Sequence, residues 1–453
     1  GNENIIAVIG DGSLSGGEAY EGLSNAGEMG TNLIIVVNDN EMSIAENHGG
    51  LYQNLKELRD TEGRSSCNFF RSLGLDYLYV GEGNDIPSLV AAFAKVKDTS
   101  RPTVVHIHTQ KGKGYAPAEA DREEFHWEMP FDLETGKPKV DCSGMEDYHS
   151  LTGKFLLEKM KEDHTVVAIS SGTPTVIGFT PERRKQAGRQ FVDVGIAEEH
   201  AVALASGIAA GGGRPVYGVY STFIQRCYDQ LSQDLCINGN PAVITVFMGT
   251  VAGMNDVTHL GFFDIPLISN IPNMVYLAPT CSEEYFAMLE WAVRQTEYPV
   301  AIRVPGVAVV HRKEEFDTDY SELNRYKMTA RGETVAILAL GSFYDLGQAL
   351  KNKLREESGV EATLINPRYI TGLDEPMLEE LKVGHRIVVT LEDGVLDGGF
   401  GEKIARYYGN SEMRVLNYGL RKEFADRYNL DELMKTNRLT DKQMAEDIAG
   451  ILE

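Results

Sequence analysis

Two short polar triplets follow apolar runs that are typical of buried strands. Gly10-Asp11-Gly12 follows the run 5–9, and Asn38-Asp39-Asn40 follows the run 33–37. Glycines at a strand-to-helix turn let backbone amides approach a phosphate, and the helix that follows adds partial positive charge. Asp11 would repel that phosphate unless a cation neutralised it, and hard oxygen ligands beside a diphosphate suit Mg²⁺. The pattern predicts a diphosphate and cation site at one sheet edge.

The spacing of the triplets, with 25 residues between them, is far more specific than either triplet alone. Together with the segments 41–45 and 111–119, it resembles the 1-deoxy-D-xylulose-5-phosphate synthase family, relatives of transketolase that use thiamine diphosphate. By that resemblance Asp11, Asn40 and the carbonyl group of Met42 hold Mg²⁺. The residues expected to contact the cofactor itself are Gly12 and Ser13 through their amides, Lys111 at the diphosphate, and Ile44 beneath the thiazolium ring. A solvated loop lysine is the alternative for Lys111.

A second motif, 193–200, leads into the small-residue helix expected over 201–210. A carboxylate at a helix start is normally a cap or a partner of the helix dipole. The resemblance gives Glu198 a sharper role, because the matching glutamate of the family shares a proton with a ring nitrogen of the cofactor and must be buried beside it. Glu199 stands where these synthases usually have Gln, and its role is open.

The segment 220–230 is also similar to the family. Phe223 would supply a flat apolar face for the pyrimidine ring, with Tyr220 nearby, although aromatics at such positions are more often plain core. Arg226 would bind the phosphate of the acceptor substrate through its fork of donors, and a surface salt bridge is the alternative.

Three more residues are assigned by resemblance to substrate contacts. His259, in the motif 258–264, and His126, in the segment 125–127, match active-site histidines of the family, and we expect both, with Glu198, to be catalytic. Arg303 matches a further arginine that contacts phosphate.

The elements that must position these residues follow an α/β pattern, in which short apolar runs alternate with helix-length amphipathic stretches. Uniformly apolar short strands are typical of parallel sheets that are covered on both faces. Strands are expected over 5–9, 33–37, 104–106, 166–169, 216–220, 243–247, 274–277, 335–340, 362–365 and 387–391.

The pattern predicts three doubly wound domains, and the resemblance implies that they are of the transketolase type. We expect a diphosphate-binding domain over 1–115, a pyrimidine-binding domain over 150–311 and a C-terminal domain over 333–453, joined by linkers over 116–149 and 312–332. Ligands usually bind at the carboxyl ends of the strands in such sheets.

Composition excludes several classes of partner. The formal charge of −24 repels nucleic acids and anionic membrane surfaces, and no apolar run approaches the length of a membrane helix. The odd number of cysteines, five, argues against a disulfide framework, so a reducing cytoplasm fits best.

The chain departs from the family pattern in three places. The family has a segment before the first triplet that carries active-site histidines and part of the cofactor sheet, so we expect this chain to be incomplete or to pair with a separate piece. The segment after the second triplet, 47–73, is shortened. Met248 falls where the family has a phosphate-binding Arg, and Asn255 falls where it has an Asp that contacts substrate. Asp256 could take over the second role only after a shift of one residue.

The resemblance implies a homodimeric, cytoplasmic transferase that depends on thiamine diphosphate and Mg²⁺. By resemblance it condenses pyruvate with a phosphorylated aldehyde, glyceraldehyde 3-phosphate, to 1-deoxy-D-xylulose 5-phosphate and CO₂. Two alternatives remain open, namely an enzyme that transfers a two-carbon ketol unit between sugars, and a non-catalytic paralogue. Retained buried charges at Asp11 and Glu198 argue against the paralogue, because unpaired buried charges lower stability.

Overall fold

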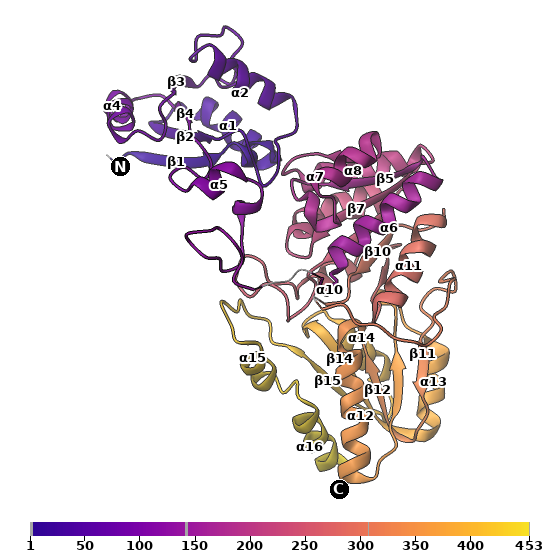
Figure 1. Cartoon of the computed structure of the whole chain (residues 1–453). Helices are drawn as coiled ribbons and strands as arrows, with labels where there is room; N and C mark the ends of the chain where they lie inside the picture. Colours follow the sequence, from indigo (N-terminus) through magenta and orange to yellow (C-terminus); the bar gives the residue numbers. More distant parts are fainter. Residues whose placement is uncertain (1–2, 141–143, 307, 453) are drawn as a thin grey trace. The chain divides into compact units, whose positions relative to one another are not determined.

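The computed structural model describes residues 3–140, 144–306 and 308–452, and contains three sheets with helices against them (Figure 1). Cys142, one of the five cysteines, lies outside the described residues. By its contacts the chain divides into two compact units. The first comprises Gly1–Met145, Ser170–Pro174 and Asp193–Glu198, and the second comprises Glu146–Ile169, Thr175–Val192 and Glu199–Glu453.

The first sheet has the strand order β1-β2-β4-β3 and is parallel throughout. Its strands are β1 (Ile5–Gly10), β2 (Leu33–Asp39), β3 (Asp76–Val80) and β4 (Thr103–His108). Its helices are α1 (Gly17–Met29), α2 (Gly50–Asp60), α3 (Phe69–Ser72), α4 (Ile86–Val96) and α5 (Ala116–Ala120), with short 3₁₀ turns η1 (Gly12–Ser15) and η2 (Glu124–His126). Helix α1 ends where Gly30 takes a left-handed conformation, and α4 begins where the Asp85 carboxylate accepts the amide of Ser88.

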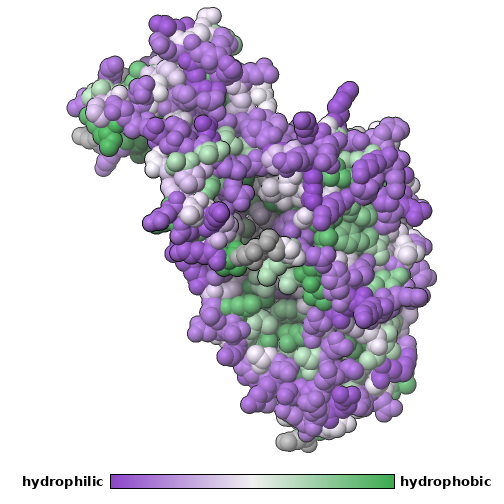
Figure 2. All heavy atoms as spheres, in the orientation of Figure 1, coloured by the Kyte–Doolittle hydropathy of each residue, from purple (hydrophilic) through white to green (hydrophobic). Residues whose placement is uncertain are grey.

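The expectation that the strands are covered on both faces is wrong for β1. Ile5, Ile6 and Val8 are 61%, 51% and 71% exposed, and β1 forms an edge of its sheet. Figure 2 shows apolar side chains gathered where Figure 1 places α4 and the N-terminus, and Ile86 and Val90 of α4 are also exposed. An exposed apolar edge strand is a template for pairing with another strand.

The second sheet has the order β6-β5-β7-β8-β10-β9. Its strands are β5 (Val166–Ser170), β6 (Phe191–Asp193), β7 (Arg214–Tyr220), β8 (Val243–Phe247), β9 (Val275–Leu277) and β10 (Val300–Arg303). The accompanying helices are α6 (Tyr148–Glu162), α7 (Pro181–Ala187), α8 (Glu198–Ala210), α9 (Tyr228–Gln230), α10 (Asp264–Ser269) and α11 (Ser282–Arg294). Shorter turns are η3 (Pro174–Ile177), η4 (Gly188–Gln190), η5 (Phe223–Cys227) and the π-helical η6 (Leu231–Cys236).

The third sheet has the order β11-β13-β12-β14-β15 and is parallel except for β11. Its strands are β11 (Lys327–Ala330), β12 (Thr334–Ala339), β13 (Thr363–Asn366), β14 (His385–Val395) and β15 (Arg414–Leu420). Its helices are η7 (Gly341–Phe343), α12 (Tyr344–Ser358), α13 (Glu375–Gly384), α14 (Phe400–Tyr408), α15 (Leu430–Thr436) and α16 (Asp441–Leu452), of which α12 and α16 pack side by side (Figure 1).

The predicted α/β fold of parallel sheets is confirmed, and every expected strand is present with small shifts at its ends. Strand β11 lies inside the segment 312–332 that was expected to be a linker. The division into three domains stays a prediction, since the second compact unit contains the whole third sheet and most of the second.

Candidate active site

The two polar triplets lie side by side at the carboxyl edge of the first sheet. Gly10 pairs with Asn38 in the parallel register of β1 and β2, and the amide of Asp11 donates to the carbonyl of Asn38 at 3.0 Å. This juxtaposition is the one predicted from the sequence. It places Asp11 and Asn40 on neighbouring turns that can share one ligand.

Asp11 is a buried carboxylate, 1% exposed, whose Oδ2 accepts a hydrogen bond from Nδ2 of Asn47 at 2.7 Å. Burial, followed by the nearby Asp39 carboxylate, raises the pKa of Asp11 to about 6. The Oδ1 atom of Asn47 is buried, and it has no hydrogen-bond partner among the described residues. Sequence reasoning missed Asn47, because only the folded loop brings it back to Asp11.

The loop after β2 carries the other predicted cation ligands. Oδ1 of Asn40 accepts the amide of Met42 at 3.2 Å, and the backbones of Met42 and Glu46 pair in an isolated antiparallel β-bridge. A Cβ on Gly12 would lie 2.6 Å from Cβ of Ser43, so the turn after β1 packs against this loop closely enough to require glycine. Carboxylate, amide and carbonyl oxygens therefore come from two adjoining turns.

Lys111 reaches the same loop. Its Nζ donates to the carbonyls of Ser43 at 2.5 Å and Ile44 at 3.4 Å, and burial lowers its pKa. Partial desolvation and the Lys111 ammonium lower the pKa of His126, so these two predicted residues are close enough to interact. Ser13 is exposed in the turn η1.

Glu198 is the first residue of α8 and is 3% exposed. The turn that leads to it is fixed by Asp193, whose Oδ1 accepts the amides of Gly172 and Gly195, each at 2.9 Å. Burial raises the pKa of Asp193. The predicted burial of Glu198 is thus observed at a helix N-terminus, whereas its catalytic role stays a prediction.

In the second unit, aromatic and polar residues gather at the end of β7. The rings of Tyr220 and Phe223 are 5.4 Å apart, and Phe223 lies 5.5 Å from the ring of His259. Nδ1 of His259 is 3.0 Å from Oδ1 of Asp256, and Nε of Arg226 is 3.5 Å from a Glu199 carboxylate oxygen. The structure therefore brings together Tyr220, Phe223 and His259. It pairs Arg226 with Glu199, whose role was left open, which is the salt-bridge alternative stated for Arg226.

Two residues expected at the substrate make other contacts. Nδ2 of Asn255 donates to the carbonyl of Tyr428 at 2.9 Å, and the carbonyl of Asn255 accepts the amide of Arg427. Arg303 is 4% exposed and donates to the Asp264 carboxylate and to the carbonyl of Asp393. These contacts tie the segments around β10 and Asn255 to the third sheet and its following loop, and the substrate roles of both residues stay predictions.

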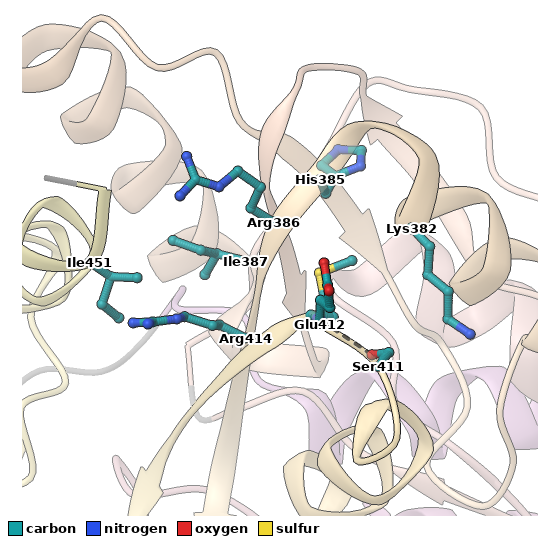
Figure 3. A pocket seen from close by; sticks show the side chains of 9 residues that line it. Lys382, His385, Arg386, Ile387, Ser411, Glu412, Arg414 and Ile451 are labelled. Atoms are coloured by element: carbon teal, nitrogen blue, oxygen red, sulfur yellow. Dashed lines mark hydrogen bonds between the residues drawn. The ribbon is translucent and has the colours of Figure 1, made fainter.

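A hollow of about 370 Å³ lies at the other end of β14 and β15, where the two strands begin (Figure 3). Two of its basic side chains are engaged within the fold, since Lys382 pairs with Glu379 and His385 contacts Thr363 and the carbonyl of Leu381. Arg386 and Arg414 extend toward the same side of the hollow (Figure 3). The hollow lies at the opposite end of β14 from Glu392 and Asp393.

The residues described here include no group of three or more His, Cys, Asp or Glu that could hold a metal ion. The donor set at Asp11 and Asn40 has one carboxylate, so it fits Mg²⁺ that is completed by amide, carbonyl and phosphate oxygens. Among the same residues, no helix is long and apolar enough to cross a membrane.

Comparisons with family models cover most of the chain. Residues 1–67 match the model described as 1-deoxy-D-xylulose-5-phosphate synthase. Residues 146–309 match the pyrimidine-binding domain of transketolase, and residues 325–444 match the transketolase C-terminal domain.

Curated relatives extend the similarity over the whole chain. The chain is 35% identical over 437 residues to the 1-deoxy-D-xylulose-5-phosphate synthase of Lachnoclostridium phytofermentans, and the match covers 88% of this chain and 69% of that protein. It is 34% identical over 490 residues to the synthase of Clostridium tetani, with 100% and 78% covered.

Among solved structures, the chain is similar to a transketolase from Pichia stipitis in complex with sedoheptulose 7-phosphate, with a TM-score of 0.55, 15% identity, and 99% of this chain and 76% of that chain covered. A split-gene transketolase, described as an inactive β4 tetramer, matches with a TM-score of 0.56 and 20% identity over 68% of this chain and 98% of its own. Both likenesses show the fold.

Proposed function

The chain belongs to the 1-deoxy-D-xylulose-5-phosphate synthase family, and on that premise we propose that it condenses pyruvate with glyceraldehyde 3-phosphate to 1-deoxy-D-xylulose 5-phosphate and CO₂. The observation that carries the proposal is the pairing of Gly10 with Asn38, which sets the two triplets beside each other. A transferase of this type needs such a site for thiamine diphosphate, and the oxygen donors fit Mg²⁺.

When bound, thiamine diphosphate stabilises the negative charge that develops on the donor carbon as CO₂ leaves. In our proposal Asp11, Asn40 and the carbonyl of Met42 hold Mg²⁺. The amides of Gly12 and Ser13 and the ammonium of Lys111 bind the diphosphate, and Ile44 supports the cofactor ring. The contacts of Lys111 with the carbonyls of Ser43 and Ile44 support this assignment, since the same ammonium can reach a diphosphate at that loop.

Glu198 is proposed to share a proton with a ring nitrogen of the cofactor's aminopyrimidine, because a carboxylate that is 3% exposed shares a proton readily with such a nitrogen. Phe223 and Tyr220 offer an apolar wall for the ring. His259, held by Asp256 at 3.0 Å, and His126 are proposed to contact the substrate. Arg226 is proposed to bind the acceptor phosphate, and we keep Arg303 and Asn255 as candidates for that side of the site.

The assembled enzyme is proposed to be a cytoplasmic homodimer. The cytoplasmic location rests on the odd number of cysteines in the sequence, five, which argues against a disulfide framework. The apolar edge of β1 supports the expectation that further polypeptide adds to this sheet. Activity is therefore to be measured on the complete protein, with any segment or subunit that accompanies this chain.

Product analysis tests the function. The complete protein, given thiamine diphosphate, Mg²⁺, pyruvate and glyceraldehyde 3-phosphate, is expected to form a pentulose phosphate that mass spectrometry identifies, with pyruvate carbons 2 and 3 incorporated. Transfer from a ketose phosphate in place of pyruvate would instead establish the ketol-transfer alternative.

A further inference from the structure

Helix α2 contacts both turns of the candidate cation site. Tyr52 and Arg59 are seven residues apart, so their side chains leave the same face of the helix. The hydroxyl of Tyr52 donates to the carbonyls of Asp11 at 3.1 Å and Gly12 at 3.2 Å. Nη1 of Arg59 lies 2.5 Å from Oδ2 of Asp39. One helix thus holds the turn after β1 and the end of β2.

Asp39 links Arg59 to the backbone of the following loop. Its side chain is fully buried, and its Oδ2 also lies 2.9 Å from Nε2 of His106 on β4. Its other oxygen, Oδ1, accepts the amide of Glu41 at 3.1 Å. Glu41 has a φ of +70°, a left-handed conformation that turns the chain sharply between Asn40 and Met42.

Arg59 also approaches Glu41 directly, with Nη2 3.4 Å from Oε2. The guanidinium therefore contacts two carboxylates on either side of Asn40 and is itself only 12% exposed. Arg59 and His106 both contact Oδ2 of Asp39, so that oxygen is not available to a cation. Among the described residues, the side-chain hydrogen-bond partner of the Asp11 carboxylate is the neutral amide of Asn47.

We propose that Tyr52 and Arg59 are positioning residues that hold the two turns at the separation a divalent cation and a diphosphate require. The inference rests on the proposed function, because it names what sets the affinity of that site. Neither residue touches the cation. Tyr52 acts through the carbonyls of Asp11 and Gly12, and Arg59 acts through Asp39 and Glu41.

Other residues of α2 provide matched controls, because its faces do different work. Leu55 and Leu58 are fully buried in the core of the unit, so they contribute packing. Lys56 pairs with Asp60 on the outer face, where both side chains are more than half exposed. A change at Leu55 tests stability without touching either turn, and a change at Lys56 tests a surface charge on the same helix.

The experiment compares Tyr52→Phe, Arg59→Met and Arg59→Lys with Leu55→Val and Lys56→Ala in the complete protein. Calorimetric titration gives the Kd of Mg²⁺ at saturating thiamine diphosphate, and thermal unfolding in cation-free buffer gives Tm. Loss of the part-buried hydrogen bonds of Tyr52, or of the charge-assisted contacts of Arg59, predicts roughly tenfold weaker Mg²⁺ binding for Tyr52→Phe and for Arg59→Met. Arg59→Lys is expected to fall between wild type and Arg59→Met, because an ammonium restores charge without the fork.

Leu55→Val and Lys56→Ala are expected to keep the wild-type Kd, even though Leu55→Val lowers Tm. Wild-type Kd values for both Tyr52→Phe and Arg59→Met would overturn this inference and leave the proposed function standing. The inference would also be overturned if Leu55→Val weakened Mg²⁺ binding as much as Tyr52→Phe and Arg59→Met do. Tyr52→Phe removes a single oxygen, so it remains informative if Arg59→Met does not fold. A wild-type protein that binds neither Mg²⁺ nor thiamine diphosphate would overturn the proposed function together with this inference.

Discussion

Nε of Arg303, on β10, lies 2.8 Å from Oδ2 of Asp264, on α10, and both side chains are buried. A second nitrogen of the guanidinium donates to the carbonyl of Asp393 on β14 at 2.6 Å. Asp393 in turn accepts the amide of Val251 at 2.8 Å. Arg303 therefore joins the second sheet to the third through a buried network.

This relationship predicts that Arg303→Met destabilises the fold. Removing one partner leaves the carboxylates of Asp264 and Asp393 buried without their cation, which lowers the free energy of unfolding by about 3–5 kcal/mol. Denaturant unfolding measures the loss, and Arg294→Met, an exposed change at the end of α11, is the control that should stay near wild type. Wild-type stability of Arg303→Met, with a raised KM for the phosphorylated acceptor alone, would show that Arg303 serves the substrate.

Replacing Glu198 separates binding from turnover. Glu198→Gln keeps the shape of the side chain but cannot share a proton as a carboxylate does. We expect turnover to fall by about 10²-fold or more, as for loss of a general acid–base group, with thiamine diphosphate affinity largely kept. Steady-state kinetics and cofactor titration measure the two effects. Glu199→Gln, one residue further along the chain, is the matched control. Unchanged turnover in Glu198→Gln would show that Glu198 has no catalytic role.

Lys111 contacts the loop 40–46 and is proposed to bind the diphosphate. Lys111→Met removes the donor that contacts the carbonyls of Ser43 and Ile44, and we expect thiamine diphosphate to bind roughly tenfold more weakly through loss of a charge-assisted contact. Lys113→Met, an exposed lysine of the same segment, should bind normally. Equal affinities of the two variants, measured by titration, would assign Lys111 to the loop alone.

Glu392 makes stability depend on pH. Its buried carboxylate accepts the amides of Phe400 and Gly401 at the start of α14, and burial raises its pKa from 4.5 to about 7. Between these two values the folded state binds more protons than the unfolded state, so the free energy of unfolding falls as pH rises. The decrease attributable to Glu392 is of the order of 3 kcal/mol at most.

Glu392→Gln should remove this contribution, so wild type loses stability relative to the variant between about pH 4.5 and 7. Burial lowers the pKa of the neighbouring Lys403 to about 8, so that ammonium stays charged through most of this window. Denaturant unfolding at several pH values gives the difference, and Glu402→Gln on the same helix is the control. A difference between wild type and Glu392→Gln that does not change with pH would contradict the prediction.

The sequence predicted the fold class because parallel strands that are buried on both faces are uniformly apolar. It missed five strands, β3, β6, β10, β11 and β15. Strands β3 and β15 include tyrosines and polar residues, β6 and β10 are only three and four residues long, and β11 lies in a charged segment. It also predicted that the two triplets meet, because parallel strands end at one edge.

The supporting residues could not be predicted in the same way. Tyr52, Arg59 and Asn47 act only after α2 and its preceding loop fold back over the turns, and no spacing rule encodes that approach. The contacts of Arg303 and Asn255 depend likewise on the third sheet and on the loop that follows it, more than 80 residues away along the chain. Local patterns predicted the candidate site residues, and tertiary contacts decided what surrounds them.

The central claim is tested most directly by CO₂ release from carboxyl-labelled pyruvate. The complete protein is supplied with thiamine diphosphate and Mg²⁺, and release is followed with and without glyceraldehyde 3-phosphate. The proposed function predicts release that the aldehyde stimulates and that stops in Glu198→Gln. No release from pyruvate under either condition, from a protein that binds the cofactor, would contradict it.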